Sequence, residues 1–198
     1  DDLFLTIKNE KSDHRANSVV KVLRRIWFVG RRGVLGDGAS NPFQQMGLKK
    51  LAIRRIRWLP DDVDAFVSMA DKMGYHSVGT LALLCYDMCQ RPGDMRKLLW
   101  GNFDGEAFKF NQEKTQTPMD LVLSPCLSKR FADIARGDDD DFIINYEATG
   151  RPYDMRMYAK IAQLVRTKAK LSSDLQIRDL RRSGATEMGQ AGCTEDEI

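Results

Sequence analysis

Apolar residues recur at helical spacing through residues 12–32, the first long pattern in the chain. An apolar side chain returns every three or four positions, and most of the basic residues lie off that stripe. This spacing predicts an amphipathic helix with one face toward a core. The apolar stripe consists of Ala16, Val19, Val20, Leu23, Ile26 and Trp27. Glycines and an Asn-Pro pair within residues 33–42 end the helix.

Two more helices are predicted behind a short basic segment. Residues 49–57 are too short and too charged for a core strand and are predicted to form a linker. Pro60 suits the first position of the next helix. The apolar stripe of that helix consists of Val63, Phe66, Val67, Ala70 and Met73. A further helix, over about residues 77–90, is apolar on nearly all sides, which predicts a central and buried position.

Three short runs of strand-type residues follow, at residues 99–103, 107–110 and 119–123. The pair Asp104-Gly105 separates the first two runs and is a strong hairpin signal. We therefore predict a small three-stranded antiparallel sheet. Helical patterns return at about residues 124–134, 153–171 and 178–190. The predicted fold class is mainly α with this small sheet, an α+β arrangement.

The last residues predict the start of one more helix. Thr194 and Glu197 have the spacing of a capping box, with Thr194 at the N-cap. The sequence ends at Ile198, one turn into that helix, and it begins without a methionine. We therefore expect a fragment of a longer protein, truncated at both ends.

The net charge of +3 is distributed unevenly along the chain. Residues 1–60 hold 13 Lys and Arg against 5 Asp and Glu, a net charge of +8, whereas residues 61–198 carry −5. So basic a segment points to a polyanion such as nucleic acid, and a solvated basic face is the alternative. The candidate DNA contacts are Arg24, Arg25, Arg31, Arg32, Lys49, Lys50, Arg54, Arg55 and Arg57.

Several function classes lack support in the sequence. His14 and His76 are not spaced with a second ligand as a zinc site requires, so no metal is expected. The glycines of residues 30–36 form no nucleotide-binding fingerprint, so no cofactor is expected. No apolar run approaches the roughly 20 residues of a membrane span. With four scattered cysteines and no basic leader, the expected location is a reducing cytoplasm.

Three short segments stand out from this background. Arg91 and Asp94 follow the predicted buried helix, and Lys114 lies in the predicted turn before the last strand. The stretch Arg178-Asp-Leu-Arg181-Arg182-Ser-Gly-Ala-Thr186 then opens a helix. In this order and context the segments resemble the tyrosine recombinase (phage integrase) family, and the resemblance covers about residues 17–198.

The resemblance implies roles in DNA strand cleavage. Arg91 and Arg181 match the two arginines that bind the non-bridging oxygens of the scissile phosphate. Guanidinium groups suit this role because they bind phosphate oxygens bidentately and stay protonated. Lys114 matches the lysine that protonates the leaving 5′ oxygen. Asp94 matches the acidic residue that braces the arginines, and a simple charge at a helix N-terminus is its alternative interpretation.

Two features depart from the family pattern. Arg178 stands where the family has a histidine, and an arginine can donate hydrogen bonds but cannot act as a base near neutral pH. Every tyrosine of this chain precedes Arg178, whereas the family's nucleophilic tyrosine follows that segment. The nucleophile is therefore unknown and expected beyond Ile198, and the fragment alone is expected to leave DNA uncleaved.

The resemblance also implies an organisation and a partner. Residues 1–40 would hold the last helix of a core-binding domain, residues 41–58 a basic linker, and residues 59–198 a catalytic domain without its C-terminal part. The parent would cleave and rejoin double-stranded DNA through a 3′-phosphotyrosyl link, without a cofactor, as a tetramer assembled on the DNA. Its affinity for DNA would depend strongly on salt.

Two alternatives remain open at this point. The first is a catalytically inactive integrase-like protein that binds DNA or regulates recombination, and Arg178 is the residue that favours it. The second is a helical protein–protein adaptor whose basic face is incidental.

Overall fold

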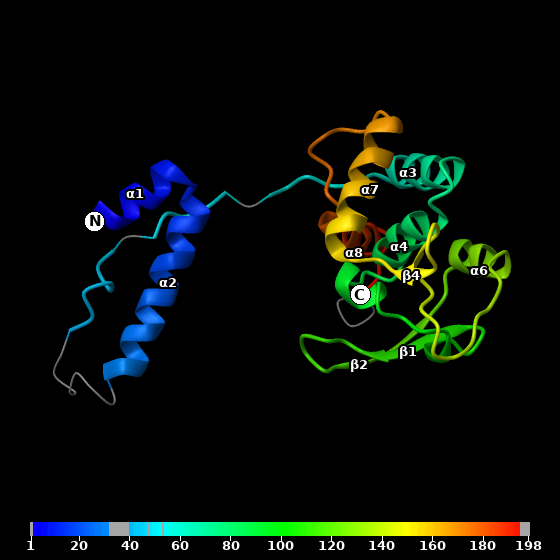
Figure 1. The fold of residues 1–198 in the computed structure, drawn as a ribbon, viewed down its shortest axis with the longest axis horizontal. Helices are drawn as coiled ribbons and strands as arrows, with labels where there is room; N and C mark the ends of the chain where they lie inside the picture. Colours follow the sequence, from blue (N-terminus) through cyan, green and yellow to red (C-terminus); the bar gives the residue numbers. More distant parts are fainter. Residues whose placement is uncertain (1, 32–39, 47, 53, 195–198) are drawn as a thin grey trace. The chain divides into compact units, whose positions relative to one another are not determined.

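The computed structural model describes residues 2–31, 40–46, 48–52 and 54–194 (Figure 1). The chain divides into two compact units, Asp1–Arg55 and Ile56–Ile198. Arg32, one of the predicted DNA contacts, lies outside the described residues, as does most of the capping box predicted at residues 194–197. None of the described helices is long and apolar enough to span a membrane.

The first unit contains two helices that pack against each other, α1 (Asp2–Glu10) and α2 (Asp13–Gly30). Ser12 caps α2, because its hydroxyl accepts a hydrogen bond from the backbone N–H of Arg15. The sequence pattern predicts α2 but not α1. The apolar stripe of α2 is only partly buried, since Ala16 and Val20 are inaccessible to solvent whereas Ile26 is 60% exposed. With 9 residues against 18, α1 is too short to cover the whole apolar stripe of α2.

The segment after α2 is held against that helix by polar side chains. Asn17 is buried, and its amide donates to the carbonyl of Lys49 (2.7 Å) and accepts from the Lys49 N–H (3.1 Å). The guanidinium of Arg24 donates to the carbonyls of Phe43, Gln44 and Met46. These bonds satisfy backbone groups of a segment that has no regular structure.

The second unit is built around α4 (His76–Asp87), whose residues from Val78 to Cys85 are all buried. This confirms the predicted central helix. Helices α3, α5, α6, α7 and α8 all contact α4 (Figure 1). Their bounds are α3 (Pro60–Lys72), α5 (Pro92–Met95), α6 (Pro125–Ala132), α7 (Met155–Lys168) and α8 (Leu180–Gln190). Two short 3-10 turns accompany them, η2 (Trp100–Asn102) and η3 (Ile177–Asp179).

The antiparallel sheet has two strands, β1 (Ala107–Asn111) and β2 (Pro118–Val122), where three are predicted. Residues 99–103 do not form the first strand. Asn102 accepts a hydrogen bond from the Leu99 N–H, which coils the segment into η2, and the Trp100 ring is buried edge-to-face against Phe131. Of the predicted pairing between the first two strands, one isolated bridge remains, between Phe103 and Phe108. A further hairpin, β3 (Asn145–Tyr146) and β4 (Arg151–Pro152), is not predicted.

Trp58 ties the beginning of the second unit to the segments before and within α8. Its side chain is fully buried, with its ring edge-to-face against Phe66. The indole N–H donates to the carbonyl of Gln176, and the backbone N–H donates to the hydroxyl of Ser183, both at 2.9 Å. Because these partners flank η3 and the start of α8, Trp58 helps to fix both elements.

Helix α8 approaches α4 most closely at Gly184. A Cβ atom at Gly184 would lie 1.9 Å from the backbone oxygen of Tyr86 and 3.3 Å from the sulfur of Cys89. Real Cβ atoms do not come so near to a backbone oxygen. A glycine is therefore required for the backbones to pack at this distance.

We expect Gly184→Ala to destabilise the second unit by about 2 kcal/mol or more, because the added methyl group forces α8 away from α4. Gly93→Ala is the matched control, since a Cβ there meets no atom within 4 Å. Urea unfolding of both variants measures the effect. Equal stability of the two variants would contradict the close packing of α8 on α4.

Candidate active site

Arg91 and Asp94 lie together in the short connection that follows α4. The chain turns at Cys89, whose φ of 51° is in the left-handed region, and Arg91 then becomes the N-cap residue of α5. The guanidinium of Arg91 lies 3.8 Å from the carboxylate of Asp94. The carboxylate is buried and the guanidinium is partly exposed. A negative charge under a solvent-facing arginine holds that arginine in place without closing access to it.

Arg181, in the first turn of α8, faces the same region. Burial lowers the pKa of the Arg181 guanidinium, the positive charge of Arg91 lowers it further, and the charge of Asp94 acts in the opposite direction. One terminal nitrogen of Arg181 is buried and has no hydrogen-bond partner in the described part of the chain. Two guanidinium groups that repel each other, one of them with an unused donor, form a local site for an anion.

Lys114 lies on the turn between β1 and β2, and this turn is bound to the Arg91 segment. The backbone N–H of Glu113 donates to the carboxylate of Asp94 at 3.3 Å. The side chain of Glu113 forms an ion pair with Lys97 (2.7 Å). Lys114 itself is exposed, and within the described residues its ammonium group has no hydrogen bond or ion pair. It is therefore free to reach a bound ligand.

Two buried glutamines at this site are not among the predicted residues. Gln112 accepts a hydrogen bond from the Arg91 guanidinium at 3.1 Å, and its own amide donates to Gln90 at 2.7 Å. Both glutamine side chains are nearly inaccessible to solvent. A single sequence contains no signal for them, because a glutamine beside a turn is ordinarily a surface residue.

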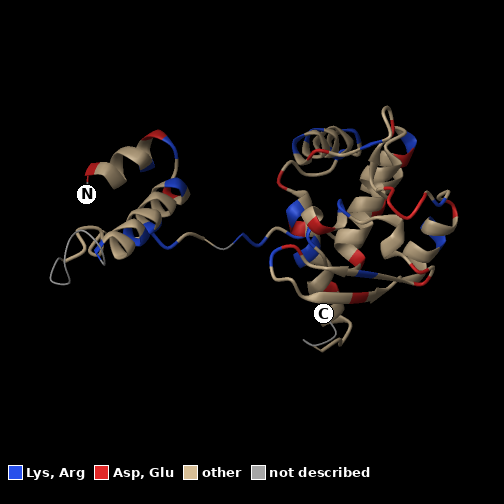
Figure 2. Ribbon diagram, turned by 60° about the horizontal axis from the view of Figure 1, so that its bottom comes forward, with Lys and Arg blue, Asp and Glu red and all other residues tan. Residues whose placement is uncertain are grey.

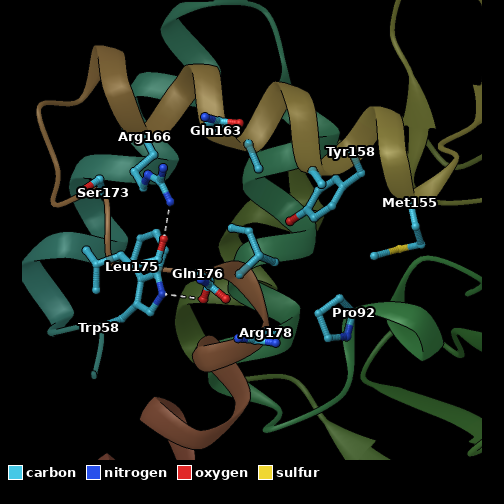
Figure 3. Close-up of a pocket in the computed structure, with 13 residues that line it drawn as sticks. Trp58, Pro92, Met155, Tyr158, Gln163, Arg166, Ser173, Leu175, Gln176 and Arg178 are labelled. Atoms are coloured by element: carbon cyan, nitrogen blue, oxygen red, sulfur yellow. Dashed lines mark hydrogen bonds between the residues drawn. The ribbon is translucent and has the colours of Figure 1, made fainter. Parts of the chain in front are cut away.

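Arg178 is exposed on η3, one turn before Arg181. It lines a pocket of about 450 Å³ together with Pro92, the residue next to Arg91 (Figure 3). The backbone that leads to Arg178 is fixed, since the Arg166 guanidinium donates to the Leu175 carbonyl and Trp58 donates to that of Gln176. Arg178 therefore lies on a pocket that reaches the residue after Arg91.

Some of the predicted DNA-contact residues form hydrogen bonds or ion pairs within the protein, and others are exposed. Arg24 donates three hydrogen bonds to backbone carbonyls, and Lys49 pairs with Asp13 at 2.7 Å. In the second unit, Arg57 contacts Gln190 and Glu187 of α8. Arg25 lies over the Phe28 ring, and Lys50 and Arg55 are exposed. Figure 2 shows the Lys and Arg of α2 and of the segment that follows it.

Comparison with known proteins gives a match only among solved structures. Neither a protein family nor a curated protein matches this sequence. A lambda integrase tetramer bound to a Holliday junction is similar with a TM-score of 0.79 and 16% identity, over 98% of this chain and 59% of that one. For the Tn1549 transposon integrase in complex with circular intermediate DNA, the TM-score is 0.74 and the identity 12%, over 98% of this chain and 72% of that one. For XerA recombinase, the TM-score is 0.58 and the identity 14%, over 96% of this chain and 67% of that one.

The chain has the fold of the tyrosine recombinase catalytic domain. The predicted fold class is thereby confirmed, apart from the missing strand. In the tyrosine recombinase fold of this chain, the end of α4, the β1–β2 turn and the start of α8 converge, and these are the three places where Arg91, Lys114 and Arg181 occur.

Three of the five tyrosines in this tyrosine recombinase fold are poor candidates for a nucleophile. Burial is the main cause that raises the pKa of Tyr158 well above its ordinary value, and it also raises the pKa of Tyr86 to about 12. Tyr153 is buried and donates its hydroxyl to Glu147, and its pKa is raised as well. Among the described residues no cluster of metal ligands is found either.

We expect sulfate to stabilise this chain, because a dianion relieves the repulsion between Arg91 and Arg181. At a sodium sulfate concentration that nearly saturates the site, the melting temperature should be about 2–4 °C higher than in sodium chloride of equal ionic strength. This corresponds to about 1 kcal/mol in the free energy of unfolding. Arg181→Ala should lose this gain and keep only the general stabilisation that sulfate gives to folded proteins through its exclusion from their surface. The control is Arg156→Ala, on the exposed face of α7, which should keep the full gain. An equal sulfate effect in the two variants would show that the anion binds elsewhere.

Proposed function

We propose that this chain is part of a site-specific DNA recombinase or integrase that cleaves and rejoins strands through a 3′-phosphotyrosyl intermediate. The observation that carries the proposal is the convergence of Arg91 and Arg181, distant in sequence, beside a buried Asp94. The fold supports it, because the similar structures include integrases bound to DNA.

The residues of this site suit the chemistry of phosphodiester transfer. The tyrosine oxygen attacks phosphorus, the new bond forms to the 3′ phosphate, and the bond to the 5′ oxygen breaks. Arg91 and Arg181 would bind the non-bridging oxygens, whose negative charge increases in the pentacoordinate state. Lys114 would give its proton to the leaving 5′ oxygen. Arg178 would add a fixed positive charge and hydrogen-bond donors, since it cannot accept a proton near neutral pH.

The rest of the chain would contribute binding rather than chemistry. The basic residues of the first unit and of the linker over residues 41–58 would contact phosphates of duplex DNA, which makes affinity strongly salt-dependent. Arg25, Lys50 and Arg55 have the accessible side chains for this role. The active form would be a tetramer on DNA, by analogy with the lambda integrase tetramer, and it would act in the cytoplasm without a cofactor.

Arg178 supports a second candidate function, an integrase-like protein that binds DNA without cleaving it. A position that helps to move a proton in the family is here occupied by a permanent cation. Such a protein would keep the anion site and the DNA affinity and would lack strand cleavage.

The decisive experiment separates cleavage from binding in the product of the complete reading frame. Arg91→Ala or Arg181→Ala should reduce formation of the covalent adduct on nicked suicide substrates by about 10²–10³-fold, the loss typical of a preorganised donor at developing charge. Affinity for duplex DNA should change little, since many other phosphates contribute. Arg156→Ala is the matched control.

The outcomes are distinct. Undiminished adduct formation in Arg91→Ala or Arg181→Ala would contradict the proposed site. DNA binding without any adduct in the unmodified protein would establish the non-cleaving alternative.

A further inference from the structure

The hydrogen bonds of the two buried glutamines are all donated in one direction, from Arg91 through Gln112 and Gln90 to the backbone of Met88. The Gln90 amide nitrogen donates to the carbonyl of Met88 (3.0 Å), which leaves the Gln90 side-chain oxygen facing Gln112. That oxygen accepts from the amide nitrogen of Gln112 at 2.7 Å. The oxygen of Gln112 must then face Arg91, from which it accepts at 3.1 Å. The orientation of each amide is set by the bond before it.

The same Gln112 oxygen also connects Arg91 to the turn that carries Lys114. The hydroxyl of Thr115 donates to it at 3.0 Å. The backbone closes the turn around this contact, with the Gln112 N–H bonded to Thr117 and the Gln116 N–H bonded to Gln112. In the sequence, Lys114 therefore lies between Gln112 and Thr115, whose side chains are hydrogen-bonded to each other.

We propose that Gln112 is a positioning residue that holds the Arg91 guanidinium and the Lys114 turn in register on one phosphate group. The inference rests on the proposed function and adds a residue to it. Gln90 is part of the same device, because it fixes which end of the Gln112 amide faces Arg91.

A neutral acceptor is the chemistry that this position requires. A carboxylate at position 112 would form an ion pair with Arg91 and neutralise the positive charge that attracts a phosphate oxygen. The amide oxygen occupies one terminal nitrogen only, and this is the one hydrogen bond from the Arg91 side chain within the described residues. The remaining N–H groups stay available for a bidentate contact with a phosphate. Burial of both glutamines excludes water that would compete for these bonds.

The test uses this chain, with sulfate as the anion, and compares three variants. Gln112→Met keeps the length of the side chain and removes the acceptor. It should weaken sulfate binding about tenfold, the usual effect of losing a hydrogen bond to a charged group. Arg91→Ala should weaken it at least as much. Gln45→Met, at an exposed glutamine of the first unit, should leave it unchanged.

A spectroscopic readout separates positioning from general stability. In the unmodified chain, restricted rotation should give Arg91 resolved terminal ¹⁵N–H signals at low temperature, identified by their loss in Arg91→Ala. Gln112→Met should average these signals while the backbone spectrum is retained. Resolved Arg91 signals in Gln112→Met would overturn the proposal.

A second variant covers the case in which Gln112→Met unfolds. Gln112→Glu still accepts from Arg91, so the Arg91 signals should stay resolved while sulfate binding falls, because the added charge neutralises the arginine. Unchanged sulfate affinity in both Gln112 variants, with affinity lost in Arg91→Ala, would overturn the role of Gln112 alone. Unchanged affinity in Arg91→Ala would instead overturn the phosphate site itself.

Discussion

The contact between α8 and the end of α4 is the constraint on which the arrangement of the site depends. At Gly184 the backbones pack so closely that a side chain would overlap the carbonyl of Tyr86. Arg181 lies one turn earlier on α8, and Arg91 lies just beyond the end of α4. The separation of the two helices therefore determines the separation of the two guanidinium groups. Trp58 supports this contact from the other side through Ser183 and Gln176.

The same packing creates an electrostatic imbalance that an anion can correct. Two like charges approach each other, and the carboxylate of Asp94 is the group that opposes their effect on Arg181 most strongly. Asp94 is shared, since it also accepts from the β1–β2 turn. A folded protein maintains such a group of charges when the rest of the core supplies enough stability. The largely buried α4 and the aromatic cluster around Phe108 and Phe131 supply it here.

Much of the fold follows from local patterns in the sequence, and the errors have physical causes. The nearly continuous apolar pattern of residues 77–90 correctly predicts the central helix, because a helix that is buried on most sides needs apolar residues on most sides. The strand predicted at residues 99–103 fails because the Asn102 side chain offers Leu99 a local hydrogen bond that competes with strand pairing. The exposure of Ile26 has a simple cause, because an apolar stripe shows which face a helix can bury and not whether a partner covers it.

The residues of the candidate site likewise fall into those that the sequence predicts and those that only the folded structure reveals. Arg91, Lys114 and Arg181 could be predicted because charged residues in a fixed order of elements are visible in one sequence. Gln90 and Gln112 could not, because their importance comes from burial and from contacts between segments some twenty residues apart. Arg178 is visible in the sequence as a departure from the histidine of the family pattern. In the structure it lines the pocket beside Pro92, and its guanidinium cannot act as a base near neutral pH.

The most direct measurement is a crystal structure of this chain grown with orthovanadate, a tetrahedral oxyanion similar to phosphate in shape and charge. The account predicts one anion that accepts hydrogen bonds from the guanidinium groups of both Arg91 and Arg181, with Lys114 turned toward it. Guanidinium groups that point to separate surfaces, more than about 10 Å apart and beyond the reach of one bidentate-bound anion, would contradict it.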